Sequence, residues 1–332
     1  MARLIRSDIR HISDAANNAD SFRVLRGRVS VLKIAPDARL MPYLELAGFG
    51  SVALIRSSDL RFDLLSALVE RWHPETHTFH FPCGECTVTL EDVAVQLGLP
   101  IDGSPVTGVS SFTDPATVCY QLLGESPEDG AVLMPDANGD SVHLSYLPLL
   151  ADLSTARSYS WGSAVLATLW TTRLGIGKSC DVPIYRLRIE QHAREGFIWM
   201  PYRRHGITNV VPSSALVDSH IWCTNTPIIN FNVVEWYHGD RVLRQFGCIQ
   251  PIPDPLCQLG DDHGLTKRGR VQLDWGIKHR KFVALWNDRL CRIPQMVMAT
   301  DLQPSLEYTQ WYHSCGKPHL LGAQSTVIPS YV

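Results

Sequence analysis

The sequence predicts a mainly α-helical, single-domain protein with minor β structure, including a small β-hairpin near residues 77–88. Three observations favour this class. Apolar residues recur at spacings of three and four in several segments, whereas alternating β-branched runs are few and short. The 332 residues are 45% hydrophobic and 19% charged, as in an ordinary globular protein that buries a core. The chain also shows no internal repeat of fixed period.

We expect an irregular N-terminal arm over residues 1–40, one globular domain over residues 41–315 and a C-terminal tail over residues 316–332. The first ten residues mix arginines with apolar residues, unlike a secretory signal. No apolar run approaches the roughly 18 residues that a membrane span needs. Nine cysteines, an odd number without a secretory signal, favour free thiols in a reducing compartment, the nucleus or the cytosol.

The clearest predicted helix covers residues 59–72. Ser57 or Ser58 is suited to capping its N-terminus, and Pro74 prevents its continuation. One apolar face follows from the helical spacing of Leu60, Leu64, Leu65, Leu68, Val69 and Trp72.

A β-hairpin and a second helix are expected to follow. Residues 76–81 alternate β-forming and polar side chains, residues 82–84 form a turn signal, and residues 86–89 can return as a strand. Thr89 with Asp92 three residues later resembles a capping box that starts a helix. Gly98 then stands where a left-handed residue ends it.

The rest of the chain predicts helices over residues 146–153, 161–174 and 183–194 and a strand over residues 228–237. Residues 103–142 are rich in turns. The segments 270–275 and 282–286 fit either a helix or a strand.

The net charge of −3 argues against binding nucleic acid over the whole surface, but the charge is distributed unevenly. Residues 72–156 contain no Lys or Arg but 12 acidic residues, whereas residues 264–292 contain eight Lys or Arg and two Asp. This pattern indicates either a solvated bipolar surface, or an acidic and a basic region that contact each other or different partners.

The segment from Tyr43 to Gly108, with its ERW, ETHTFH, TVTL and LGLP runs, closely resembles the plant mobile domain of the maintenance-of-meristems family. This family, sometimes labelled aminotransferase-like, includes the serine/threonine-protein phosphatase 7 long-form homolog and occurs in plant transposable elements. Further matches extend to Tyr312. The motif residues, which we expect to be structural, are Trp72, Thr76, His77, Phe79, His80, Gly84, Asp92, Gly98, Trp161, Arg241, Gln245 and Gly247. Of these, Trp72, Phe79 and Trp161 are expected to be buried in the core.

The chain departs from the family pattern near residues 124–135 and 171–182, where family members continue with longer helical sequence. We therefore infer an internally deleted copy, or a splice or gene-model variant, in which apolar neighbours of the missing helices lose their partners. The resemblance implies a role in meristem maintenance, plant development, genome stability and transposable-element silencing in the nucleus. It also implies a protein partner, such as another plant mobile domain protein.

Catalytic readings lack required motifs. Residues 260–264 read GDDHG, like one metallophosphoesterase motif, but the motifs that complete a two-metal site are absent from the sequence. Gly177-Lys178-Ser179 resembles the end of a phosphate-binding loop, but Thr172 occupies the place of the required glycine, so we read it as a loop. No lysine has the context of a pyridoxal Schiff base.

The candidate metal ligands also lack the spacing or the number that a metal site needs. Pro74 separates His73 from His77, so a helix cannot place both imidazoles on one face. Cys83 and Cys86 have metal-knuckle spacing, but no second pair completes a zinc site. We therefore expect no catalytic residues, no cofactor and no metal.

The basic stretch is the best functional candidate, because cations attract phosphates and the interleaved Trp275 and Phe282 could stack on bases. It comprises Lys267, Arg268, Arg270, Lys278, Arg280 and Lys281. Contacts within the protein or with a protein partner are the alternative, and Arg241 to Gly247 can equally pair with the acidic region. We expect a non-enzymatic interaction protein that binds no membrane. A DNA- or RNA-binding module derived from a transposon-encoded protein is the second reading.

Overall fold

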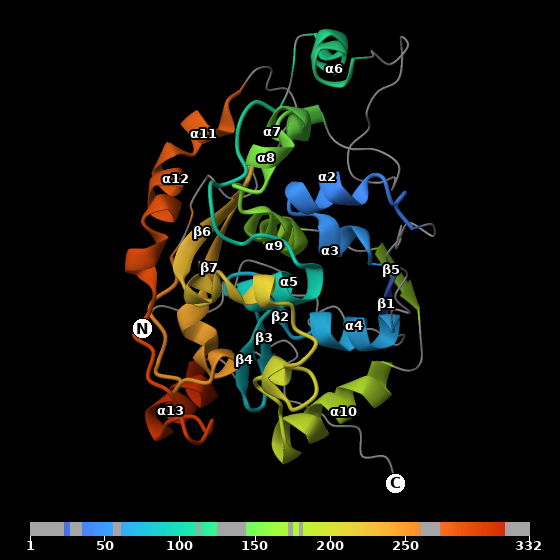
Figure 1. Ribbon diagram of the computed structural model, residues 1–332. Helices are drawn as coiled ribbons and strands as arrows, with labels where there is room; N and C mark the ends of the chain where they lie inside the picture. Colours follow the sequence, from blue (N-terminus) through green and yellow to red (C-terminus); the bar gives the residue numbers. More distant parts are fainter. Residues whose placement is uncertain are drawn as a thin grey trace.

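Figure 1 shows the computed structural model, which describes residues 23–26, 35–55, 61–110, 112, 114–124, 144–171, 175–178, 182–257, 259 and 273–315. Within this part of the chain the fold is mainly helical, and its strands form short antiparallel sheets, as the sequence predicts. The tail predicted for residues 316–332 lies outside the described residues, as does most of the predicted arm.

The first predicted helix is shorter than expected. Helix α4 spans Phe62–Val69, and Trp72–His73 form strand β2 instead of a last helical turn. The prediction that Trp72 belongs to the helix was therefore wrong. Pro74 restricts the residue before it to extended conformations, so the chain leaves the helix before His73 rather than at the proline.

Strand β2 joins the predicted hairpin in a three-stranded sheet. Strands β3 (Thr78–Phe81) and β4 (Gly84–Cys86) form the hairpin, and Phe79 lies opposite both Trp72 and Cys86 in the register. The rings of Trp72 and Phe79 meet edge to face, with centroids 4.8 Å apart, and both are half-buried. We expected both to be fully buried, but they lie on one face at the edge of the core.

Helix α5 (Leu90–Leu97) begins and ends as predicted. The Thr89 hydroxyl accepts from the Asp92 amide, and the Asp92 carboxylate accepts from the Thr89 amide, which completes the capping box. Gly98 ends the helix at φ 65°, and a Cβ there would overlap Ser51. A glycine is thus needed both for the left-handed turn and for the close approach of helix α3 (Gly50–Ala53), which contains Ser51.

Helices α2 (Met41–Leu46) and α3 (Gly50–Ala53) form the side of the molecule opposite α12 (Arg280–Asn287) in Figure 1. Between them, helix α9 (Trp161–Thr171) packs on a second hairpin, and α12 packs on the same hairpin.

This second hairpin consists of β6 (Asn225–Asn230) and β7 (Val233–His238), where the sequence predicted one strand. The chain reverses at Phe231, which has φ 49°, and its amide donates to the Val106 carbonyl at 2.8 Å. The turn leaves the Phe231 side chain fully buried.

The remaining elements surround these layers. Strand β1 (Arg23–Arg26) pairs antiparallel with β5 (Gly175–Lys178), and α10 (Val182–Glu195) packs on α4. Gly177 and Lys178 therefore lie in a strand, where we predicted a loop. The other α-helices are α6 (Pro115–Leu123), α7 (Leu147–Leu150), α8 (Leu153–Ala156), α11 (Trp275–Lys278) and α13 (Leu306–Cys315). Short 3-10 turns are η1 (Leu144–Tyr146), η2 (Pro201–Arg203), η3 (Ser213–Leu216), η4 (Ser219–Ile221), η5 (Gly239–Phe246) and η7 (Arg289–Arg292).

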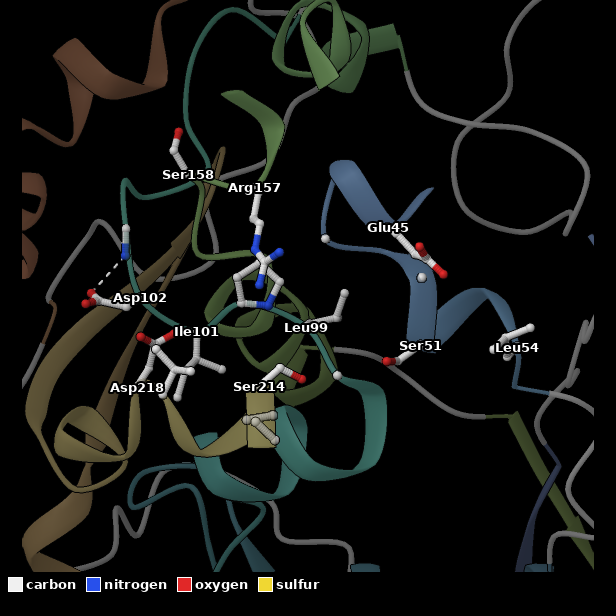
Figure 2. A pocket seen from close by; sticks show the side chains of 18 of the residues that line it. Glu45, Ser51, Leu54, Leu99, Ile101, Asp102, Arg157, Ser158, Ser214 and Asp218 are labelled. Atoms are coloured by element: carbon white, nitrogen blue, oxygen red, sulfur yellow. Dashed lines mark hydrogen bonds between the residues drawn. The ribbon is translucent and has the colours of Figure 1, made fainter. Parts of the chain in front are cut away.

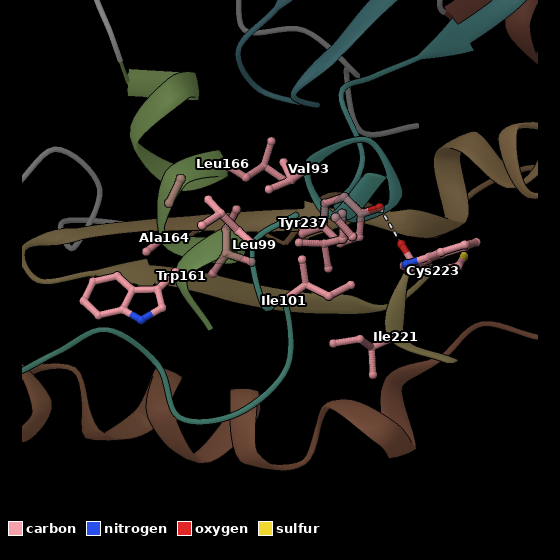
Figure 3. Packing of buried hydrophobic residues seen from close by; sticks show 14 of the residues in the cluster. Val93, Leu99, Ile101, Trp161, Ala164, Leu166, Ile221, Cys223 and Tyr237 are labelled. Atoms are coloured by element: carbon pink, nitrogen blue, oxygen red, sulfur yellow. Dashed lines mark hydrogen bonds between the residues drawn. The ribbon is translucent and has the colours of Figure 1, made fainter. Parts of the chain in front are cut away.

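The largest hydrophobic cluster lies between α5, α9 and the second hairpin (Figure 3). Trp161 opens α9 and is 6% exposed, as the sequence predicted. Its indole N–H donates to the Ala156 carbonyl at 2.7 Å, and its ring packs 5.3 Å from that of Phe49. Trp161 thereby joins α9 to the α2–α3 side of the molecule.

Replacing Trp161 by alanine should lower the free energy of unfolding by about 3–5 kcal/mol, because the change leaves a cavity in the main cluster. Val165→Ala, on the same helix but 39% exposed, should leave stability nearly unchanged. Chemical denaturation followed by circular dichroism measures both. Equal effects of the two substitutions would contradict this placement of the core.

Candidate functional site

A buried ion pair joins Glu85 on β4 to the motif residue Arg241 in η5. The Arg241 Nε and Nη2 atoms donate to the two Glu85 carboxylate oxygens at 2.7 and 2.8 Å. Thr78 donates to the same carboxylate at 2.9 Å. Both charged side chains are almost entirely buried, and two parallel bonds are the geometry that best repays this burial.

Two neighbours in η5 extend the contact with the hairpin. Arg244 donates to the Cys83 carbonyl at 2.8 Å, and its guanidinium lies 3.8 Å from the ring centroid of Trp199. A Cβ at Gly84, which has φ 133°, would clash with this guanidinium. The motif glycine is thus explained by the close approach of Arg244.

Gln245 bonds to the backbone just after β4. Its amide oxygen accepts from the Thr87 amide at 2.8 Å, and its nitrogen donates to the Thr87 carbonyl at 3.0 Å. Gly247 then ends η5 in a left-handed conformation with φ 81°. The expectation that Arg241 to Gly247 can pair with the acidic region is confirmed, because Glu85 belongs to that region.

The motif histidines are also held by internal contacts. His77 Nε2 lies 3.1 Å from a Glu235 carboxylate oxygen, and its ring stacks on Trp170. His80 is fully buried, with its ring 3.9 Å from that of His73. In the described part of the chain, no three His, Cys, Asp or Glu side chains form a group that could hold a metal ion.

The contacts of Glu85, Arg241, Arg244 and Gln245 form one polar network, and hydroxyl groups add further hydrogen bonds to it. Thr76 and Thr78 share a hydrogen bond of 2.6 Å between their hydroxyls. From α13, Tyr312 donates to the Phe81 carbonyl at 2.7 Å, and the Tyr308 hydroxyl accepts from the Glu85 amide at 3.4 Å. Helix α13 therefore closes over the hairpin, and solvent does not reach the ion pair.

Sequence reasoning missed the central partners. Glu85 and Arg244 stand inside recognised runs but were not singled out, and Tyr308 lay near the end of the resemblance. Gln250 was also missed: its side chain accepts from the Leu243 amide at 2.8 Å and donates to the Asp240 carbonyl at 2.7 Å. The acidic residue in CGEC and the aromatic residues in EYTQWY were the available signal, but they do not identify a partner.

Glu91, in the first turn of α5, carries an unusual carboxyl group. Burial, reinforced by the charge of Asp92 and opposed by that of Arg203, raises its pKa to about 7. Tyr202 donates to the Asp92 carboxylate at 2.7 Å and keeps this acid beside Glu91. The pair lies where the 201–203 turn covers α5.

A cleft of about 510 Å³ opens between helices α2 and α3 and the residues that follow α5 (Figure 2). One wall consists of α2 and α3, and the other of residues 98–103, Arg157 with Ser158, and the chain around η3. The side chains of Asp102 and Asp218 lie at one end of the view, and Glu45 lies at the other.

Asp102 and Asp218 are supported differently. Arg289 donates to Asp102, and His220 Nε2 lies 3.6 Å from the same carboxylate. Burial and the neighbouring charge of Asp102 raise the pKa of Asp218, opposed by His220 and Arg157. The nearby cations therefore do not fully offset the desolvation of Asp218.

The predicted basic stretch is only partly described. Lys267, Arg268 and Arg270 lie outside the described residues, as does the GDDHG run. On α11 and α12, the side chains of Lys278, Arg280 and Lys281 are exposed.

The interleaved aromatics are not on the surface, contrary to what base stacking would need. Trp275 is fully buried and donates to Ser110 at 2.6 Å, and Phe282 packs against the second hairpin. Helical spacing turns these rings into the core while the cations face solvent. Arg289, at the end of the same stretch, contacts Asp102, so the acidic and basic regions do touch at this point.

Glu85 and Arg241 both lie within the ranges of the chain that match a known family. The family model described as plant mobile domain matches residues 48–132 and 168–313. The chain is 30% identical to the serine/threonine-protein phosphatase 7 long form homolog of Arabidopsis thaliana, over 81% of this chain and 28% of that protein. It is 28% identical to the Protein MAINTENANCE OF MERISTEMS of the same plant, over 74% and 70% of the two chains. It is 27% identical to the Protein MAIN-LIKE 2 of that plant, over 91% and 59%.

None of the solved structures matches significantly. The alignment with the phosphatase homolog runs over 377 positions, more than the 332 residues of this chain, so that relative carries internal segments without a counterpart here. This agrees with the predicted internal shortening, whose places remain a prediction. In the described residues, no helix has the length and apolarity to cross a membrane.

Removing one partner of the buried ion pair should be strongly destabilising. Arg241→Met or Glu85→Gln alone should cost about 3–5 kcal/mol, since each leaves a buried polar or charged group unpaired. The double variant should cost less than the sum of the single variants. Arg39→Met, which breaks an exposed pair with Asp37, is the matched control and should leave stability nearly unchanged. Additive losses in urea denaturation would contradict a direct coupling.

Glu91 should make stability depend on pH. Its pKa in the folded protein, about 7, lies above the ordinary 4.5, so the folded state binds the proton more tightly. Stability should therefore fall by up to about 3 kcal/mol as pH rises from about 4.5 to about 7. Glu91→Gln should remove this part of the fall, whereas Glu307→Gln, on an exposed turn of α13, should not. Denaturation at several pH values gives the free energy of unfolding against pH. The same dependence on pH for wild type and Glu91→Gln would contradict the prediction.

Proposed function

Since the chain belongs to the plant mobile domain family, with relatives named for the maintenance of meristems, we propose that it is a non-enzymatic nuclear interaction protein. In this proposal it contributes to meristem maintenance, genome stability and the silencing of transposable elements. Its partner is a protein, and a longer plant mobile domain protein is the first candidate.

One observation carries the proposal. Polar residues of the family motifs form bonds inside the molecule: Arg241 to Glu85, Gln245 to Thr87, and His77 to Glu235. These residues are occupied in holding the hairpin, η5 and β7 together. What the family shares is then a scaffold, and the activity of each member is expected on its surface.

Exposed apolar side chains support a protein partner. They occur on the helices that flank the two predicted shortenings: Tyr120 on α6, Leu169 on α9 and Ile184 on α10. An additional helix in a longer relative would have such residues as neighbours. A related protein that supplies this helix from outside would bury the same surface.

A second candidate function is binding of DNA or RNA. The exposed cations Lys278, Arg280 and Lys281 favour it, because they can contact phosphates. Trp275 and Phe282 are buried, so contacts of this kind would be mainly with the backbone of the nucleic acid.

The test mixes the purified chain with the Arabidopsis Protein MAINTENANCE OF MERISTEMS at low and high salt. Size-exclusion chromatography with light scattering should show a complex at both, and the chain should melt at a higher temperature within it. The triple variant Lys278→Gln, Arg280→Gln, Lys281→Gln should form the same complex. No complex, together with salt-sensitive DNA binding that the triple variant loses, would overturn the proposal in favour of the second function.

A further inference from the structure

We propose that the cleft between α2–α3 and residues 98–103 binds a short extended segment of a protein partner, one that carries Lys or Arg beside apolar side chains. This inference rests on the proposed function and specifies the chemistry of the partner. It concerns a surface apart from the Glu85–Arg241 ion pair and its neighbours, although Gly98, Leu99 and Pro100 of the LGLP run line the cleft.

The cleft has an apolar floor. Its buried lining side chains are Ala94, Leu99, Ile101 and Ala215, so the floor is a continuation of the main hydrophobic cluster. Its volume of about 510 Å³ lies within the range of sites that enclose a small ligand or a few side chains. Apolar side chains of a partner would therefore leave water for a preformed apolar surface.

Both edges of the cleft also expose apolar side chains. Leu54 on the α3 side is 54% exposed, and Val217 on the opposite side is 70% exposed. Beyond Leu54, helix α2 exposes Tyr43 and Leu46, and beyond Val217 the chain exposes Leu216. Exposed apolar residues on both rims, three of which lie outside the cavity lining, suit an occupant that extends across the cleft better than an enclosed small molecule.

Charge selects a basic occupant. Three carboxylates, those of Glu45, Asp102 and Asp218, line the cleft with one arginine, Arg157 (Figure 2). Asp102 is already bonded to Arg289, whereas no ion pair joins Asp218 to another described side chain. A cation of the partner placed beside Asp218 would form an ion pair with a carboxylate that has already lost part of its hydration.

The walls are held in place before any partner binds. Gly98 lets Ser51 pack directly on the end of α5, and at Gly48 a Cβ would lie 3.3 Å from Arg157 and 3.4 Å from Pro100. These close contacts fix α2–α3 against the opposite wall. A preformed cleft reduces the entropy that binding costs.

The test uses two fluorescein-labelled octapeptides as probes, one alternating Leu with Lys and one alternating Leu with Glu. Fluorescence anisotropy with the full chain should show that the Lys peptide binds at least about tenfold more tightly than the Glu peptide. The double variant Glu45→Gln, Asp218→Asn and the double variant Leu54→Ser, Val217→Ser should each weaken the Lys peptide about tenfold. The matched control Glu307→Gln, Leu306→Ser makes the same kinds of change on exposed residues of α13 and should bind like wild type.

Circular dichroism confirms that each variant is folded. Equal affinity for the two peptides, cleft variants that bind like wild type, or a loss in the α13 control would each overturn the inference. The complex with the Protein MAINTENANCE OF MERISTEMS separates this result from the proposed function. If the complex forms and survives both cleft variants while the Lys peptide does not bind, the cleft inference fails and the proposed function stands. If the Lys peptide binds only the intact cleft but no complex forms, the proposed partner is wrong and the cleft inference stands.

Discussion

The burial of one ion pair constrains the rest of this structure. Glu85 and Arg241 are 156 residues apart in the chain, and neither can be buried alone without a cost of several kcal/mol. The β3–β4 hairpin and the η5 turn must therefore form together. Once they do, Arg244 reaches the turn of the hairpin and Gln245 bonds along its second strand, while α13 closes over both with Tyr308 and Tyr312. A polar network of this kind specifies one arrangement, because any other leaves charged groups unpaired.

This internal use of polar residues separates the scaffold from its surface. In Figure 1 the β3–β4 hairpin and α13, which carry the network, lie on one side of α5, and the α2–α3 wall of the cleft lies on the other. Arg289 connects the two regions of opposite charge by bonding to Asp102 at the cleft wall. The η7 turn, which follows α12, thus supports a carboxylate of the proposed binding surface, while the cations at the start of α12 stay exposed. The Glu85–Arg241 network and the cleft are thus formed by different residues.

Local signals were predicted well, and long-range ones were not. The capping box at Thr89 and the left-handed Gly98 depend on residues that are near in sequence, so the pattern specifies them directly. Trp72 was assigned to a helix because its spacing fits, but pairing with β3 decided its conformation. The side chains of Trp275 and Phe282 looked like base-stacking candidates because the sequence does not show which face of a segment meets the core. For the same reason Arg241 was recognised as a motif residue, but its partner Glu85 could not be identified without the fold.

Amide hydrogen exchange tests most directly whether the hairpin and η5 are coupled through their ion pair. The slowest amides of residues 78–86 and of residues 239–247 should open with the same free energy, equal to that of global unfolding, because neither segment can leave while the other keeps its charge buried. Under increasing denaturant the two sets should merge into one unfolding curve. If the hairpin amides exchange through a low-energy local opening while those of residues 239–247 stay protected, the ion pair does not couple the hairpin to η5.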